Sequence, residues 1–347
     1  MPEFYYIPLY IFPNLPITRL KILPGLSIEK CSKKVNSRID HKIEAWGLGA
    51  KTGYSFNPNY NIKIVVKDYD TYQRIEAVKN FGEEEFKKTI TKSPDLPDWV
   101  SETRIRPPNA ARHAILSLSL FGLYKFKFGG YFHFDSNLKI GGFSNYPIQS
   151  SNLLGHIKCK GENFKRKRIS QIAQEMNVYF GPYIWQMDRL SLALSSMWAA
   201  LCTNQVEQSF LSLTTALEAI LTTQAQEITH QLAERASFLL CKEPSERYAT
   251  YKDIKSIYKT RSKIVHGKAF LSKKGMDRES IFISLGRSRV PETDFSNLFR
   301  ITQKVIKACF ENNRFRTIIQ AGKSEKKISD EIDEYFIGLI TGTEKIS

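Results

Sequence analysis

Hydrophobic residues recur at helical spacing through the second half of the chain. Val206, Phe210, Leu213, Leu217 and Ile220 follow one another at intervals of four and three residues, the repeat that places side chains on one face of an α-helix. The same repeat predicts further helices on either side. The predicted helices cover, roughly, residues 184–202, 205–223, 227–241, 245–267, 294–312 and 325–340.

Shorter repeats in the first half predict β-strands. Residues 61–66 are rich in β-branched side chains, and residues 124–134 alternate around Gly129 and Gly130. Two glycines suit a tight turn that needs positive φ angles, so a β-hairpin is predicted there. The alternation would place on one face of this hairpin the rings of Tyr124, Phe126, Phe128, Tyr131 and His133. We expect this aromatic face to pack in the core, and a platform for stacking bases is the alternative.

Proline content separates the two halves of the chain. Eleven of the fourteen prolines lie at or before Pro147, and none lies between Tyr183 and Glu243. Because proline interrupts both helices and central strands, residues 1–147 should be rich in loops and mostly β, with one helix near residues 71–86. The later part of the chain is free to form long helices.

These patterns predict the α+β class with two domains. A β-rich N-terminal domain with its linker would cover residues 1–168, and an all-α helical bundle would cover residues 169–347. The first domain holds 27 Lys and Arg against 15 Asp and Glu, whereas the second holds the other 24 and 20. Most of the net charge of +16 therefore belongs to the N-terminal domain. A basic domain favours polyanions such as RNA or DNA, and a contribution to solubility alone is the alternative.

Four consecutive basic residues lie at the predicted junction of the domains, namely Lys165, Arg166, Lys167 and Arg168. Their charge would suit the phosphate groups of a nucleic acid. A solvated linker is the favoured interpretation, because runs of like charge usually stay in solvent.

Several classes of protein are disfavoured by the sequence. The longest apolar stretch, Leu190–Cys202, is broken by serines and is too short for a membrane span, and no signal peptide is expected. The five cysteines are odd in number and form no CxxC pair, which argues against a disulfide framework and against a zinc site. No phosphate-binding glycine loop or metalloprotease motif is present. We therefore expect a cytoplasmic protein with no metal, no cofactor and no membrane partner.

A charged residue interrupts the apolar stripe of the fourth predicted helix. The stripe consists of Tyr251, Ile254, Tyr258, Arg261 and Val265, at intervals of three and four residues. A guanidinium on a core-facing stripe is costly unless it is paired or hydrogen-bonded, because it cannot shed its charge. Arg261 should therefore face a carboxylate or a polar cleft.

A histidine follows Arg261 at the end of the same predicted helix. His266 lies five residues after Arg261 and directly before Gly267. We expect the helix to begin with Ser245 as its N-cap and to end at Gly267, because these residue types favour those positions.

A second pair, Arg106 and His113, has a comparable spacing. Pro107 and Pro108 lie between them, and two consecutive prolines are expected to prevent a helix that could present both side chains. The pair is excluded as a candidate site on that ground.

Three segments around Arg261 and His266 resemble the Apea-like branch of the HEPN superfamily. Thr215–Ile220 (TALEAI) is similar to the Ala-Leu-Glu-Ala helix of that family, and Leu232–Arg235 (LAER) is similar to its middle helix. Tyr258–Gly267 (YKTRSKIVHG) is similar to the motif in which a tyrosine precedes Arg-Ser and the segment closes on Val-His-Gly. The resemblance covers about residues 184–315 and does not extend to residues 1–165.

The resemblance implies a compact helical bundle that pairs with a second copy of itself. In catalytic members the arginine and histidine of both copies line a shared cleft, where RNA is cut without a metal by attack of a ribose 2′-hydroxyl on the neighbouring phosphate. On that basis His266 would transfer protons, and Arg261 would stabilise the charge that builds up on the phosphate. Ser262 would hydrogen-bond the phosphate or hold the arginine.

Two further residues of the resembling segments, Glu218 and Tyr258, have more than one possible role. Glu218 is expected mainly to orient Arg261 or Arg235 through a buried ion pair, and a direct catalytic role is the minority interpretation. Tyr258 either lines the cleft or only packs.

The expected function is therefore that of a metal-independent endoribonuclease that leaves 2′,3′-cyclic phosphate ends, of the antiphage (abortive infection) or toxin type. RNA, a homodimer formed through the helical domain, and a phage-derived trigger or an antitoxin are the expected partners. The main alternative is a non-catalytic HEPN protein that dimerises or binds RNA under the control of its N-terminal domain. A regulatory protein that binds DNA or RNA through the basic half is a third possibility, with no recognised motif in its favour.

Overall fold

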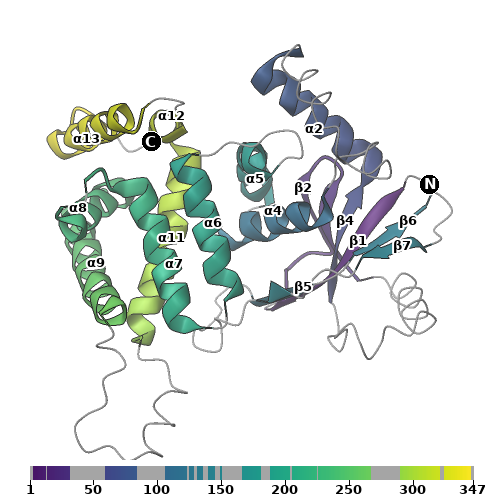
Figure 1. Cartoon of the computed structure of the whole chain (residues 1–347), viewed down its shortest axis with the longest axis horizontal. Coiled ribbons are helices and arrows are strands. Elements are labelled where there is room, and N and C mark those ends of the chain that lie inside the picture. The colour runs from purple at the N-terminus through teal and green to yellow at the C-terminus, as the bar shows by residue number, and fades with distance from the viewer. Residues whose placement is uncertain are drawn as a thin grey trace, which may run out of the picture. The chain divides into compact units, whose positions relative to one another are not determined.

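Two compact units make up the protein, and each is described by itself (Figure 1). The N-terminal unit holds the elements from β1 to α5, and the second unit holds those from α6 to α13. The mixed α+β class, with an antiparallel sheet early in the chain and helices later, agrees with the prediction. The computed structural model describes residues 3–12, 14–31, 59–83, 106–122, 125–128, 131–135, 140–144, 149–150, 166–180, 188–203, 205–224, 226–266, 290–320 and 324–344.

The described strands of the N-terminal unit form one antiparallel sheet. Its main path has the order β2-β3-β4-β1-β5-β8, and β6 pairs with both β1 and β7. β1 is central, and its residues Ile7, Leu9 and Ile11 are almost completely buried. The strands are β1 (Phe4–Phe12), β2 (Arg19–Leu23), β3 (Leu26–Lys30), β4 (Tyr60–Val65), β5 (Lys125–Phe128), β6 (Tyr131–Phe134), β7 (Ile140–Ser144) and β8 (Gln149–Ser150).

The predicted hairpin of β5 and β6 is wrong. Both strands run antiparallel to β1 and follow one another along it, β5 opposite Leu9–Phe12 and β6 opposite Phe4–Tyr6. The register on β1 moves by one residue between the two strands, next to Pro8, which has no N–H to donate to a neighbouring strand. The glycine pair, which lies outside the described residues, therefore separates two strands that run in the same direction.

The single aromatic face predicted for these strands is also wrong. Phe126, Phe132 and Phe134 are buried, whereas Tyr131 and His133 are partly exposed. Of the residues predicted to form that face, core packing holds for Phe126, whereas the buried Phe132 and Phe134 were not among them. Tyr124 and the side chain of Phe128 lie outside the described residues.

Three helices are described in the N-terminal unit: α2 (Val66–Phe81), α4 (Pro107–Ser119) and α5 (Arg166–Phe180). α2 begins and ends about five residues before the helix expected near residues 71–86. α4 contacts β1, β3 and β4, and α5 contacts α4 and β2. Gln73 of α2 and Asn177 of α5 exchange two buried amide hydrogen bonds of 2.6 and 3.0 Å, which link these helices.

α4 corrects the argument that two prolines exclude a helix. Pro107 and Pro108 are its first two residues, where a backbone N–H has no helical partner and its absence costs nothing. Arg106 is the exposed N-cap and His113 is completely buried. The two side chains form no site, but burial is the reason rather than the lack of a helix.

α5 occupies the place of the predicted linker. Arg166, Lys167 and Arg168 are the exposed first turn of this helix, and Lys165 lies outside the described residues. The expected domain boundary after residue 168 falls inside α5. The apolar face of α5, which begins at Ile169, is buried within the N-terminal unit.

His113 is a buried neutral histidine. Its Nε2 donates to the carbonyl oxygen of Ala173 at 2.8 Å, its ring stacks on Phe180, and its Nδ1 has no hydrogen-bond partner among the described residues. Burial lowers the pKa of His113 from 6.5 to about 4, although the bond to Ala173 opposes the shift.

The stability of the protein should consequently depend on pH through His113. Between about pH 6.5 and about pH 4 the unfolded chain binds a proton that the folded chain does not, so acidification destabilises the fold by about 3 kcal/mol. This stability is fully present above about pH 6.5. Urea unfolding at several pH values should show that the free energy of unfolding of the wild type falls with pH in this window and that it falls less in His113→Leu. An equal fall in the wild type and the variant would contradict the assignment to His113.

The second unit is helical throughout its described elements. Each of the six predicted helices has a counterpart, and α12 was not expected. α11 contacts α6, α7, α8 and α9, while α13 contacts α8 and α12. No described helix is long and apolar enough to cross a membrane. The helices are α6 (Arg189–Cys202), α7 (Val206–Leu221), α8 (Ile228–Leu240), α9 (Pro244–Val265), α11 (Glu292–Glu311), α12 (Asn313–Gln320) and α13 (Glu325–Thr341).

Candidate active site

α9 carries the arginine and the histidine singled out in the sequence. It begins at Pro244, with Glu243 rather than Ser245 as its N-cap, because proline suits the first helical position. It ends at Val265, and His266 is the C-cap, whose N–H donates to the carbonyl oxygen of Ser262 at 3.0 Å. The predicted terminal glycine, Gly267, lies outside the described residues.

The buried face of α9 differs from the predicted stripe at its C-terminal end. Ile254 and Tyr258 are buried as expected, but Val265 is 54% exposed and Ile264 takes its place in the core. Arg261 lies at the edge of the buried face, with 31% of its side chain exposed. The prediction for Val265 is therefore wrong, and Arg261 is half-buried.

Glu218 of α7 is the carboxylate that faces Arg261. Its Oε1 lies 3.0 Å from Nε of Arg261, and its Oε2 accepts a long hydrogen bond of 3.5 Å from Nη2. Tyr258 donates its hydroxyl hydrogen to the same Oε1 at 2.6 Å, and its ring centroid lies 5.6 Å from Cζ of Arg261. One carboxylate thus links α7 to two residues of α9.

Electrostatics reinforce this arrangement. Burial, and then the neighbouring Glu218, raise the pKa of Tyr258 well above its ordinary value. The phenol therefore stays protonated and acts as a donor. Nε of Arg261 is buried, and its N–H is directed at no acceptor in the described structure despite the short distance to Glu218. Arg261 is positioned by charge and packing more than by well-aligned hydrogen bonds.

His266 and Ser262 are both exposed. Within the described part of the chain, neither side chain makes a hydrogen bond. A residue five positions further along a helix is displaced by about 7.5 Å along the axis and by about 140° around it. Arg261, drawn towards α7, and His266 therefore point to different sides of α9 in one copy of the chain.

Arg235 belongs to a different cluster. It donates hydrogen bonds to the carbonyl oxygen of Leu221 at 2.7 Å and to Thr223 at 3.1 Å, and it forms an ion pair with Asp333 of α13. Its guanidinium also lies over the ring of Phe336. Burial lowers the pKa of Arg235, against the influence of Asp333. Of the two arginines proposed as partners of Glu218, only Arg261 contacts it in the described structure.

The remaining predicted contact residues lie in the other unit. Arg166, Lys167 and Arg168 project from the start of α5. Among the described residues, no group of three or more His, Cys, Asp or Glu side chains could hold a metal ion.

No family model, curated protein or solved structure matches the chain. A functional assignment therefore depends on the residues of the site.

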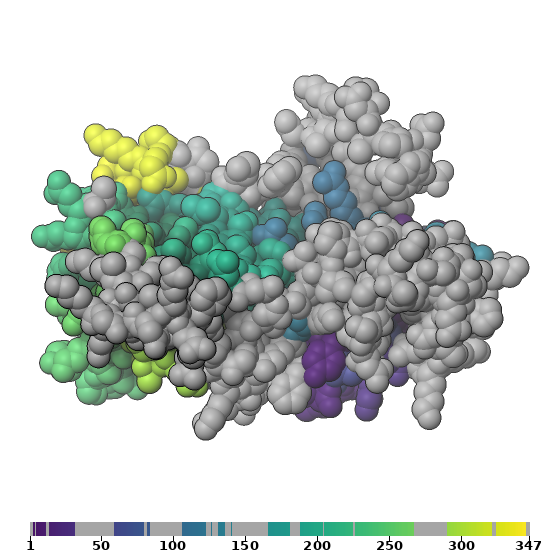
Figure 2. All heavy atoms as spheres, turned by 60° about the horizontal axis from the view of Figure 1, so that its bottom comes forward, coloured from purple at the N-terminus to yellow at the C-terminus, as the bar shows by residue number. Residues whose placement is uncertain are grey.

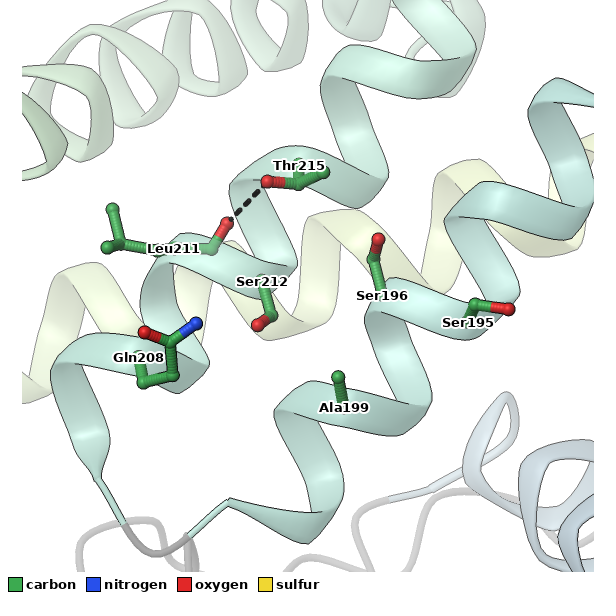
Figure 3. A pocket seen from close by; sticks show the side chains of 7 residues that line it. All are labelled: Ser195, Ser196, Ala199, Gln208, Leu211, Ser212 and Thr215. Atoms are coloured by element: carbon green, nitrogen blue, oxygen red, sulfur yellow. Dashed lines mark hydrogen bonds between the residues drawn. The ribbon is translucent and has the colours of Figure 1, made fainter.

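A surface groove between α6 and α7 was not predicted (Figure 3). Its volume is about 280 Å³, and no lining side chain is charged. The serines that interrupt the apolar run in residues 190–202 were the available signal, because two of them line the groove. The lining residues are Ser195, Ser196, Ala199, Gln208, Leu211, Ser212 and Thr215.

The side chains that line the groove include hydroxyl, amide and apolar groups but no charged group. The hydroxyl of Thr215 donates to the carbonyl oxygen of Leu211 at 3.0 Å, so this hydroxyl hydrogen already has an acceptor. Thr215 precedes Glu218 by three residues, which places both on neighbouring positions of α7. Glu218 itself does not line the groove, and no lining side chain is ionisable in the ordinary pH range.

Proposed function

We propose that the protein is a metal-independent endoribonuclease of the HEPN type that works as a pair of identical chains. The observation that carries the proposal is the arrangement on α9, where Arg261 is held by Glu218 and Tyr258 while His266 is exposed at the end of the same helix. It is supported by the resemblance of three segments in this unit to the Apea-like family.

The chemistry needs two proton transfers. The 2′-hydroxyl of the RNA loses a proton as it attacks the adjacent phosphorus, and the 5′-oxygen gains a proton as the P–O bond breaks. His266 would serve one of these transfers, and Arg261 would stabilise the extra negative charge on the phosphate oxygens. Ser262, which is exposed one residue after Arg261, would hydrogen-bond the same phosphate.

A second copy of the chain would complete the site. One His266 cannot be base and acid at two oxygens at once, and within one chain it points away from Arg261. Two copies that face each other would supply two imidazoles and two guanidinium groups to one phosphate. A homodimer formed through the helical unit is therefore part of the proposal.

The biological role proposed with this activity is that of a defence or toxin-type nuclease in the cytoplasm. The basic N-terminal unit would respond to a phage-derived trigger or bind an antitoxin or RNA. The exposed basic turn Arg166–Arg168 is the described part of the predicted nucleic-acid contact in that unit.

A non-catalytic HEPN protein is the second candidate, and one observation favours it. The guanidinium of Arg261 already has Glu218 within ion-pair distance, so its charge is partly neutralised before any phosphate arrives. In that case the helical unit would dimerise or hold RNA without cutting it.

The identity of the nucleophile provides the test. A short RNA that is cut should resist cutting when its sugars at every position are 2′-deoxy, and the RNA products should end in a 2′,3′-cyclic phosphate. Mass spectrometry of the products distinguishes this end from a 3′-hydroxyl. Products with 3′-hydroxyl ends, or equal cutting of the deoxy strand, would contradict the mechanism. No cutting of any RNA by the dimer would favour the non-catalytic candidate.

A further inference from the structure

The exposed face of α9 carries a regular series of basic side chains. Lys252, Lys255, Lys259 and Lys263 follow Tyr248 at intervals of four, three, four and four residues, which keeps all five on one side of the helix. All five are exposed. We call them the α9 strip. It runs for about 27 Å between Tyr248 and the level of His266. Figure 2 shows that the green part of the chain, which includes α8 and α9, reaches the molecular surface.

The positive charge of the α9 strip is not neutralised within the described structure. None of its four lysines forms an ion pair with a described residue. The acidic residues of α9 lie elsewhere: Glu246 is in the first turn, and Asp253 pairs with Arg300 at 3.5 Å. Four adjacent ammonium groups without an acidic partner among the described residues attract a polyanion, because its binding releases condensed counterions.

Aromatic rings alternate with these cations at the N-terminal end of the strip. Tyr248 is 61% exposed, and Nζ of Lys252 lies 4.3 Å from its ring centroid. Tyr251, on the adjacent edge of α9, has Nζ of Lys255 at 5.4 Å from its ring and Nδ1 of His230 at 3.2 Å from its hydroxyl. Tyr248 is therefore exposed and Tyr251 half-buried, and each ring lies beside a lysine. Accessible rings next to cations are the arrangement that binds unpaired bases by stacking and their phosphates by charge.

We propose that the α9 strip binds single-stranded RNA, with bases stacked on Tyr248 and Tyr251 and phosphates held by the four lysines. The strip ends beside His266, so a bound strand is led towards the site of cutting; this last part rests on the proposed function. A duplex is excluded as the preferred ligand, because its bases are stacked on each other and cannot stack on the tyrosines.

Binding is measured on the full chain carrying His266→Ala, in EDTA, with a labelled oligouridylate as the probe. Lys255→Gln with Lys259→Gln should weaken binding at least about tenfold and should lower the slope of log affinity against log salt by about 1.4. The matched control is Lys326→Gln with Lys327→Gln, which removes the same charge from two exposed lysines of α13. The control pair should bind nearly as well as the parent.

Stacking is tested at Tyr248, whose exposure makes a loss of folding unexpected. Tyr248→Ala should weaken binding by about tenfold, whereas Tyr248→Phe should retain it. The proposal would be overturned if the two lysine double variants weakened binding equally, or if Tyr248→Ala bound the oligouridylate as well as the parent. It would also be overturned if a duplex, an acidic peptide or anionic vesicles competed for binding as well as the single strand does.

The same variants separate this inference from the proposed nuclease activity. With His266 restored, undiminished cutting by the Lys255 and Lys259 variant would overturn the role of the strip and leave the nuclease intact. If the wild-type chain cuts no RNA but binds it in a way that depends on the α9 strip, the proposed nuclease activity would be overturned and the proposed binding role of the strip would stand.

Discussion

Replacing Arg261 with alanine is expected to slow RNA cutting by about 10²–10³-fold. In the proposed mechanism the guanidinium stabilises negative charge on the phosphate, and alanine would leave the carboxylate of Glu218 without this counter-charge, so that it would repel the substrate. Single-turnover cutting of a short labelled RNA measures the effect. Arg261→Lys should recover little of the rate, because an ammonium group cannot contact two oxygens in the geometry of a guanidinium.

Stability has to be separated from catalysis in this experiment. Loss of Arg261 leaves Glu218 with Tyr258 as its remaining partner among the described residues, so a loss of about 1–2 kcal/mol in the free energy of unfolding is expected. Glu218→Gln changes the other partner of the same ion pair, so it should lower the free energy of unfolding by a similar amount. Because this variant keeps Arg261, it should cut RNA faster than Arg261→Ala does. If both variants cut at the same rate, Arg261 acts through the fold and has no direct role.

Replacing Arg235 with methionine is expected to lower the free energy of unfolding by about 3 kcal/mol. The buried guanidinium is the partner of Asp333 and of the carbonyl oxygen of Leu221, and methionine fills the space without replacing either bond. Urea unfolding followed by circular dichroism measures the change. RNA cutting by the folded variant should be unaffected, because Arg235 lies in a cluster separate from Arg261.

Arg247 provides the matched control. Its side chain donates one hydrogen bond of 2.9 Å to the carbonyl oxygen of Cys241 and packs on Phe238, and it has no carboxylate partner among the described residues. Arg247→Met should therefore cost only about 1 kcal/mol. An equal loss in the two variants would contradict the structural role assigned to the ion pair of Arg235 and Asp333.

The helices of the second unit could be predicted because their signal is local. Apolar side chains recur every three or four residues over many turns, and packing against α11 follows the same faces. The interruption of one such face by Arg261 correctly called for a carboxylate, since a charge at that place needs a partner. Glu218 was one of few acidic residues on an apolar helix, so the pair could be anticipated.

Most of the predictions that proved wrong concern contacts between residues that are distant in the sequence. Local turn chemistry at Gly129 and Gly130 favours a hairpin, but pairing with β1, more than a hundred residues earlier, determines the register instead. Asp333, the partner of Arg235, lies 98 residues away, and no spacing rule connects them. α4 was missed because its prolines were read as breakers without regard to their position in the first turn.

The α9 strip is visible in the sequence, but its proposed role could not be predicted from the sequence. Its lysines are visible in the sequence at helical spacing, yet charged residues on a helix usually form only a solvated face. The information that distinguishes it is structural: the exposure of Tyr248, the cation contacts of the two tyrosines, and the lack of acidic partners for the lysines among the described residues.

The most direct test of the central claim is incubation of total cellular RNA with the purified full chain in EDTA, beside His266→Ala. His266 is exposed and makes no side-chain hydrogen bond in the described structure, so the variant should fold and dimerise like the wild type. The account predicts that the wild type cuts RNA in EDTA and that the variant is slower by about 10²–10⁴-fold. Equal cutting by the two proteins, or wild-type cutting that stops in EDTA, would contradict it.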